Sequence, residues 1–145
     1  MKTTVFLFLF MFLVSPSFAL EDDMVVICAR LPKEAITAKT IERIYLKRKE
    51  FWEDGLRVVP VNLPTDNPLR AAFTSKVVGK PHDSLVTYWN EQHYKGISPP
   101  LVLESEEAVK RFVRGVPGAV GYIRKKNMEE GLKVIYAVEG DAGKD

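Results

Sequence analysis

The stretch that decides the fold runs Val58-Val59-Pro60-Val61-Asn62-Leu63-Pro64-Thr65-Asp66-Asn67-Pro68-Leu69-Arg70-Ala71-Ala72-Phe73. Its first part is rich in valine and predicts a buried strand over residues 56–61. Asn67 is a suitable N-cap residue and Pro68 suits the first helical position, so a helix begins there. Apolar residues then recur at three- and four-residue steps until Gly79, which is expected to end the helix. A strand, a loop and a helix therefore follow one another directly.

The same periodicities extend the pattern in both directions. Strands are expected over residues 24–29, 101–103, 119–123 and 132–138. Helices are expected from an N-cap at Thr40 to Lys47, from His82 or Asp83 to His93, and over 106–114 behind an N-cap at Ser105. Strands that alternate with helices predict an α/β domain with a mixed or mainly parallel central sheet flanked by helices.

The first nineteen residues look like a secretory signal. Lys2 precedes an unbroken apolar run from Val5 to Val14, and small residues around Ala19 suit a signal peptidase. The alternative is a buried N-terminal helix; ten residues are too few to span a bilayer. We therefore expect a signal peptide over 1–19, a single domain over 20–145, and a periplasmic or secreted protein.

Composition excludes several classes of function. The net charge of +2 lacks the basic excess of a nucleic-acid binder. The single cysteine, Cys28, cannot form an internal disulfide and suits a buried strand. His82 and His93 have no further histidine or cysteine beside them, so no metal site or cofactor is expected. No Gly-rich phosphate loop or nucleophile elbow is present, and we expect a binding protein without enzyme activity.

The loop between the second strand and its helix is the candidate binding site, because ligands of α/β sheets collect where strand ends meet helix starts. Free amides at a helix start attract anions. Thr65 and Asn67 can add hydrogen bonds, and Arg70 can fork onto an oxyanion. Asp66 repels a dianion, but it can accept a proton from a protonated ligand or pair with Arg70. The plainer alternative is a capped helix with a surface arginine.

The chain also resembles a known family. Its markers are Phe51-Trp52-Glu53-Asp54-Gly55, the strand and helix described above with Pro68-Leu69-Arg70 and Phe73, Tyr88-Trp89, Ser105 at a helix start, and Pro117-Gly118-Ala119-Val120-Gly121-Tyr122. Together they are similar to the short phosphate ABC transporter substrate-binding-like proteins, within the type 2 periplasmic binding protein fold. The resemblance covers roughly residues 24–136 and implies a single lobe of that fold.

The resemblance implies that a small anion such as phosphate is bound for ABC-type uptake or sensing, with an ABC permease or a membrane sensor as partner. The chain departs from this family in two respects. It is long enough for one lobe only, and the loop at residues 62–68 lacks the consecutive run of serine, glycine and threonine found in the family's phosphate loop. A ligand-free periplasmic module that docks on a membrane sensor or transporter is therefore the alternative. A homodimer that supplies a second wall fits either hypothesis.

Overall fold

The computed structural model describes residues 23–139. The expected signal peptide at 1–19 lies outside the described residues. Within the part that is described, no helix is long and apolar enough to cross a membrane.

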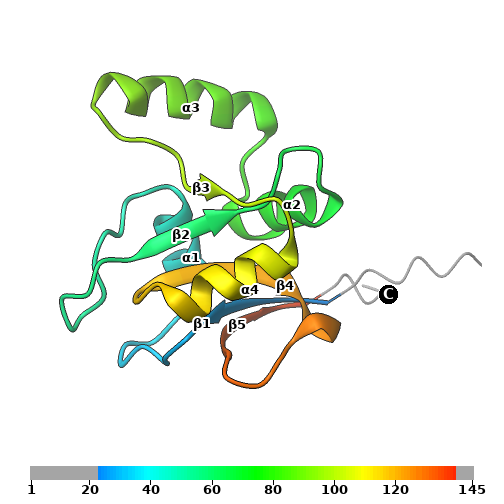
Figure 1. Ribbon diagram of the computed structural model, residues 1–145. Coiled ribbons are helices and arrows are strands. Elements are labelled where there is room, and N and C mark those ends of the chain that lie inside the picture. Colours follow the sequence, from blue (N-terminus) through cyan, green and yellow to red (C-terminus); the bar gives the residue numbers. More distant parts are fainter. Residues whose placement is uncertain (1–22, 140–145) are drawn as a thin grey trace, which may run out of the picture.

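A five-stranded mixed sheet forms the centre of the molecule (Figure 1). Its strands are β1 (Met24–Cys28), β2 (Val59–Asn62), β3 (Leu101–Val102), β4 (Ala119–Arg124) and β5 (Lys133–Val138), in the spatial order β3-β2-β4-β1-β5. β2 is parallel to β3 and β4, whereas β1 is antiparallel to β4 and β5. All five residues of β1 are buried, as expected for an interior strand covered on both faces. The predicted α/β class with a mixed sheet is confirmed.

Helices cover both faces of the sheet. They are α1 (Ala38–Tyr45), α2 (Pro68–Phe73) continuing into the π-helical turn η1 (Thr74–Val78), α3 (His82–Tyr94), α4 (Glu106–Gly115) and the short 3-10 helix η2 (Lys125–Asn127). In Figure 1, α4 lies across the near face of the sheet, and α1 and α2 lie behind it. α3 stands away from the body on two connecting segments.

Several element boundaries differ from the sequence-based expectation. Thr37, and not Thr40, is the N-cap of α1; Thr40 occupies the third helical position and completes a reciprocal capping box. The second strand begins at Val59 and not at Leu56, because residues 50–58 close a loop in which Trp52 N bonds Leu56 O at 2.8 Å. The cap at Asn67 and the left-handed end of the helix at Gly79 (φ 65°) are confirmed.

An aromatic cluster beneath β2 fixes the end of that strand. The ring of Phe73 stacks on that of Tyr122, with centroids 3.9 Å apart, and meets the edge of Tyr45 at 4.7 Å. The hydroxyl of Tyr45 donates to Val61 O at 2.9 Å. The hydroxyl of Tyr122 donates to Asn62 Oδ1 and accepts the amide of Leu63 at 3.3 Å. Both buried hydroxyls are therefore hydrogen-bonded, and these bonds fix the end of β2 at the point where the candidate loop begins.

Candidate ligand-binding site

The loop from β2 to α2 is held by its own hydrogen bonds. Asn67 N bonds Pro64 O at 3.0 Å, and Asn67 Oδ1 accepts the amide of Leu69 at 2.9 Å. Pro68 has no amide hydrogen to offer. The Nη1 group of Arg70 donates to Leu63 O at 2.8 Å, across the base of the loop. One of the helix-start amides is therefore already satisfied, and part of the guanidinium serves the loop itself.

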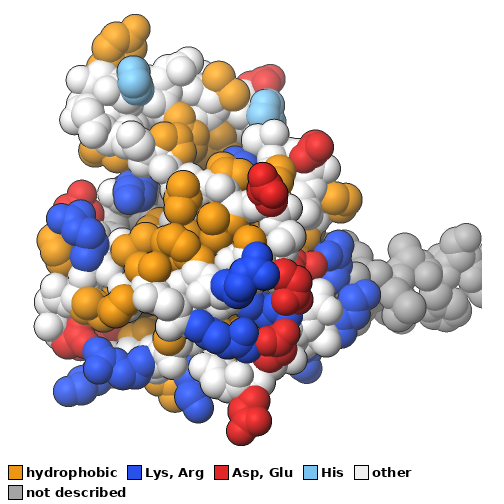
Figure 2. Space-filling model, in the orientation of Figure 1, with side chains coloured by type: hydrophobic (Ala, Val, Ile, Leu, Met, Phe, Trp, Pro, Cys, Tyr) orange, Lys and Arg blue, Asp and Glu red, His pale blue; other side chains and the backbone are white. Residues whose placement is uncertain are grey.

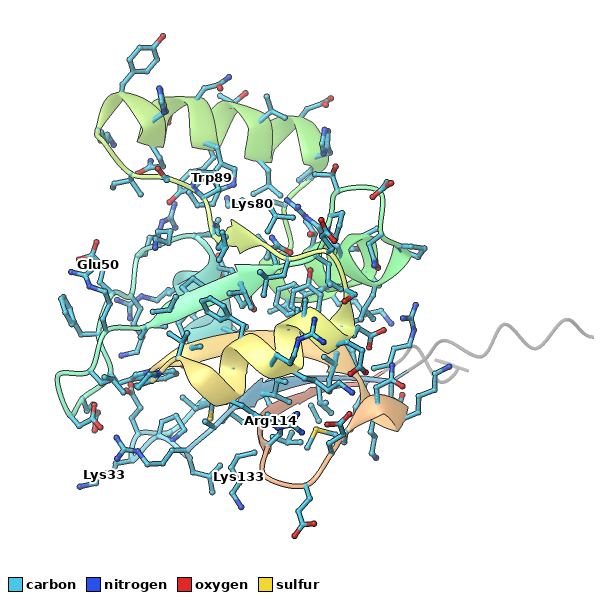
Figure 3. All side chains as sticks on the ribbon, viewed as in Figure 1. Lys33, Glu50, Lys80, Trp89, Arg114 and Lys133 are labelled. Atoms are coloured by element: carbon cyan, nitrogen blue, oxygen red, sulfur yellow. The ribbon has the colours of Figure 1, made fainter. Side chains whose placement is uncertain are left out.

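A pocket of about 760 Å³ opens beside this loop, between the α2–η1 segment and α3. One wall consists of Thr65, Arg70, Ala71, Thr74 and Ser75. The connector and α3 close the other side with Gly79, Lys80, Pro81, His82, Leu85, Val86, Trp89 and Asn90. In Figure 3, Trp89 lies on the side of α3 that faces the body, and Lys80 lies in the space below it.

The charged side chains that line this pocket, Arg70 and Lys80, are both positive. His82 also lines it, and none of the pocket-lining residues in the described chain is an aspartate or a glutamate. Hydroxyls of Thr65, Thr74 and Ser75 can donate to an anion without adding charge. An arginine presents several donors in a fork that fits the oxygens of a carboxylate or a phosphate. The pocket is suited to hold an anion.

The four residues expected from the sequence do not all meet in this pocket. Thr65 and Arg70 line it, whereas Asp66 and Asn67 do not. Asp66 is exposed, and Asn67 is used as the helix cap. Contact of all four residues with a ligand remains a prediction.

Sequence reasoning missed several residues that line the pocket: Thr74, Ser75, Lys80 and His82. Thr74 and Ser75 lie on η1, Lys80 lies on the connector after Gly79, and His82 begins α3. They become neighbours of the loop only because α3 turns back over it. Trp89 carried a weak signal, as an aromatic residue that suits either a core or the wall of a cleft.

A smaller cavity of about 120 Å³ extends the pocket toward the ends of β2 and β3. It shares Arg70, Thr74, Leu85 and Trp89 with the larger pocket and reaches Asn62 and Val102. Burial raises the pKa of the Tyr122 hydroxyl, while the Leu63 amide and the charge of Arg70 act in the opposite direction. The tyrosine is neutral at physiological pH, so the positive charge of Arg70 has no phenolate to neutralise it.

Cys28, the last residue of β1, lines a separate pocket of about 370 Å³. Its Sγ donates to Arg30 O at 2.7 Å, and burial raises the pKa of the thiol to about 11. A thiol that keeps its proton is a poor nucleophile and a poor metal ligand. In the described residues, no group of three or more histidine, cysteine or acidic side chains is placed to hold a metal ion.

Comparison with known proteins gives matches of structure alone. No family model matches the sequence, and no curated protein matches it. An ABC-type phosphate transport receptor from Vibrio cholerae aligns with a TM-score of 0.62 at 19% identity, over 79% of this chain and 45% of the receptor. A putative phosphate ABC transporter substrate-binding protein from Clostridium perfringens, with bound phosphate, gives 0.62 at 19% identity over 79% and 44%. PstS from Borrelia burgdorferi gives 0.60 at 16% identity over 79% and 46%.

These neighbours define the fold of the chain. It has the fold of one lobe of the phosphate ABC transporter substrate-binding proteins, as the sequence resemblance predicted. The chain spans less than half the length of the receptors that it matches. The first two neighbours are described as a phosphate transport receptor and a putative phosphate substrate-binding protein.

Proposed function

We propose that this protein is an exported solute-binding-like protein that holds a small oxyanion, phosphate or a related ion, in the pocket beneath α3. The observation that carries the proposal is the pocket beside Arg70, whose charged side chains are positive and whose hydroxyls come from the β2–α2 loop and from η1. The neighbours of the same fold are phosphate receptors, and one of them is described with bound phosphate.

In this proposal Arg70 contacts the ion with the part of its guanidinium that does not serve Leu63 O. Thr65 adds a hydroxyl from the loop. Asp66 and Asn67 act at the rim: Asn67 keeps the helix start in place, and exposed Asp66 disfavours a fully deprotonated ligand. ABC-type uptake or sensing then requires an ABC permease or a membrane sensor as partner, and export places the protein in the periplasm or outside the cell.

Isothermal titration with phosphate, sulfate and small carboxylates tests the proposal. Binding of one of these ions to the wild-type protein is expected, with an affinity at least tenfold lower in Arg70→Ala, because a hydrogen bond to a charged group contributes about 1.5–3 kcal/mol. Arg111→Ala is the matched control: it removes an exposed arginine of α4 that does not line the pocket. No binding of any of these anions ends the proposal.

A second candidate is a ligand-free module that docks on a membrane sensor or transporter. One observation favours it: Asn67 and Arg70 are used for hydrogen bonds within the loop itself. Copurification from membranes then recovers a partner in the absence of phosphate, and a protein that stays alone in every condition contradicts it. Light scattering reports whether two copies associate to supply a second wall, which is compatible with either candidate.

A further inference from the structure

The pocket beneath α3 is too large for the ion alone. Its volume of about 760 Å³ lies within the range of about 300–1,000 Å³ that encloses ligands of drug-like size. An inorganic phosphate has five heavy atoms and fills a small part of such a space. If an anion binds beside Arg70, most of the pocket remains free for a substituent that is attached to the anion.

The two walls of the pocket differ in polarity. The α2–η1 wall contributes Thr65, Arg70, Thr74 and Ser75, whereas the α3 wall presents the apolar side chains Leu85, Val86 and Trp89. Leu85 and Trp89 are four residues apart and share one face of the helix. Figure 2 shows hydrophobic side chains on the side of α3 that is turned toward the body.

This apolar face is incompletely covered by the protein itself. Leu85, Tyr88 and Trp89 are each partly exposed, Val86 is 48% exposed, and Gln92 is the buried residue of α3. Tyr88 is engaged with the body through its hydroxyl, which donates to Leu46 O at 2.6 Å. Leu85, Val86 and Trp89 face the open pocket instead, where an apolar group of a ligand removes their surface from water.

We propose that the ligand is an organic phosphate monoester with a flat apolar substituent, and that Trp89 binds this substituent while Arg70 and Lys80 bind the phosphate. The inference rests on the proposed function, since it assigns the remainder of the same ligand. Aromatic rings stack on flat apolar groups in an offset or edge-on arrangement, and an indole offers the largest such surface. Lys80, in the connector before α3, lies between the two walls and adds positive charge to the phosphate end.

Titration of the purified protein with phenyl phosphate, inorganic phosphate and phenol tests the inference. Phenyl phosphate is expected to bind at least tenfold more tightly than inorganic phosphate, and phenol to bind more weakly than phenyl phosphate. Equal affinities for phenyl phosphate and inorganic phosphate overturn the inference and leave the proposed function intact. Binding of phenyl phosphate alone supports the inference. Binding of neither phosphate overturns the inference, and the proposed function is overturned as well if sulfate and the small carboxylates also fail to bind.

Variants of α3 locate the substituent. Trp89→Ala is expected to remove most of the advantage of phenyl phosphate while it changes the affinity for inorganic phosphate less than twofold. Tyr94→Ala is the matched control, since Tyr94 is an aromatic residue of the same helix, is 90% exposed and does not line the pocket. Equal weakening of both ligands by Trp89→Ala contradicts the inference, and Trp89→Leu, which keeps the apolar bulk, distinguishes loss of the flat ring from loosening of α3.

Fluorescence gives a second readout. The sequence has two tryptophans, and Trp52 is buried at 7% exposure. In a Trp52→Phe protein the emission comes from Trp89, and phenyl phosphate is expected to shift it, whereas sulfate is expected to leave it nearly unchanged. No change of emission at a phenyl phosphate concentration that saturates the calorimetric titration places the substituent elsewhere and overturns the inference.

Discussion

Gly118 occupies a position at which no side chain fits. Its φ is +80°, and a Cβ atom built there lies 2.0 Å from the carbonyl oxygen of Arg57. The oxygen is a backbone atom and cannot rotate away. The contact lies where Val59 N bonds Gly118 O at 3.0 Å and β2 begins to pair with β4. A methyl group therefore forces these two segments of the sheet apart.

We expect Gly118→Ala to lower the free energy of unfolding by about 3 kcal/mol or more, because steric overlap is added to the cost of a left-handed residue. Gly55→Ala is the matched control. Its φ is +83°, but nothing lies within 4 Å of its Cβ, so only the conformational cost of about 1–2 kcal/mol applies. Urea unfolding of both variants measures the difference, and equal losses contradict the steric argument.

Glu106 carries a pH dependence that can be isolated. Burial alone raises the pKa of its carboxyl group, but hydrogen bonds from the Arg124 amide at 2.6 Å and from Asn127 Nδ2 at 3.0 Å, together with the Arg124 guanidinium, bring the pKa below its usual value. A lowered pKa in the folded state contributes stability above the unfolded pKa of about 4.3, and this stability is lost as the pH falls through the folded pKa.

The difference in unfolding free energy between wild type and Glu106→Gln is therefore expected to be largest above about pH 5 and to shrink as the pH falls below about 4. Urea unfolding at a series of pH values measures it. Glu104→Gln, at an exposed residue just before α4, is the control for the removal of one negative charge. A Glu106 difference that is constant from pH 3 to pH 7 refutes the assignment.

At the scale of elements, α3 and α4 differ in how much of each helix is buried against the rest of the molecule. α4 buries Val109, Lys110 and Val113 against the sheet. α3 is anchored mainly through Tyr88, whose hydroxyl bonds Leu46 O and whose ring lies 5.2 Å from the guanidinium of Arg48. A helix with few buried contacts opens at a low free-energy cost.

Amides of α3 are expected to exchange with deuterium at least tenfold faster than amides of α4. Tyr88→Phe removes one hydrogen bond, about 1 kcal/mol, and should accelerate exchange in α3 roughly fivefold while exchange in α4 is unchanged. Mass spectrometry of peptides from the two helices gives both rates. Equal protection of α3 and α4 in the wild type contradicts this account of how α3 is held.

Local signals in the sequence were sufficient for most elements. Asn67 and Pro68 predicted the start of α2, and Gly79 predicted the end of η1, which continues α2. Ser105 predicted the start of α4. These predictions succeeded because caps depend on hydrogen bonds within a few residues. The predicted N-cap of α1 was wrong by three residues. Thr37 and Thr40 both have a side chain that can cap a helix, and each accepts the backbone amide of the other. The reciprocal bonds put the cap on the earlier threonine.

At the scale of the whole molecule, the sheet pairs strands that are far apart in the chain, and these pairings could not be predicted from the sequence. Pairing of β1 with β4 and β5 brings residues near 26 beside residues near 122 and 136. The pocket likewise depends on where α3 comes to rest, so Arg70 was found from its own helix, but Lys80 and His82 were not. A single lobe of a two-lobed fold could be predicted because the sequence markers of that family occur along the chain in the expected order.

Ligand binding should change the stability of the molecule as a unit. A ligand that binds the folded state alone stabilises it by about 2.7 kcal/mol at a concentration of one hundred times Kd, which is a rise in Tm of roughly 10 °C for a domain of this size. Arg70→Ala lowers the starting Tm, because the bond to Leu63 O is lost, so the ligand-induced shift is the quantity to compare. At the same ligand concentration, a tenfold weaker affinity leaves about 1.4 kcal/mol of stabilisation, so we expect the shift to fall to about half or less in Arg70→Ala and to be retained in full in Arg111→Ala. A shift of the same size in both variants means that the anion binds outside the pocket, and no shift with any anion leaves the docking module as the better account of a lobe that reserves Asn67 and Arg70 for itself.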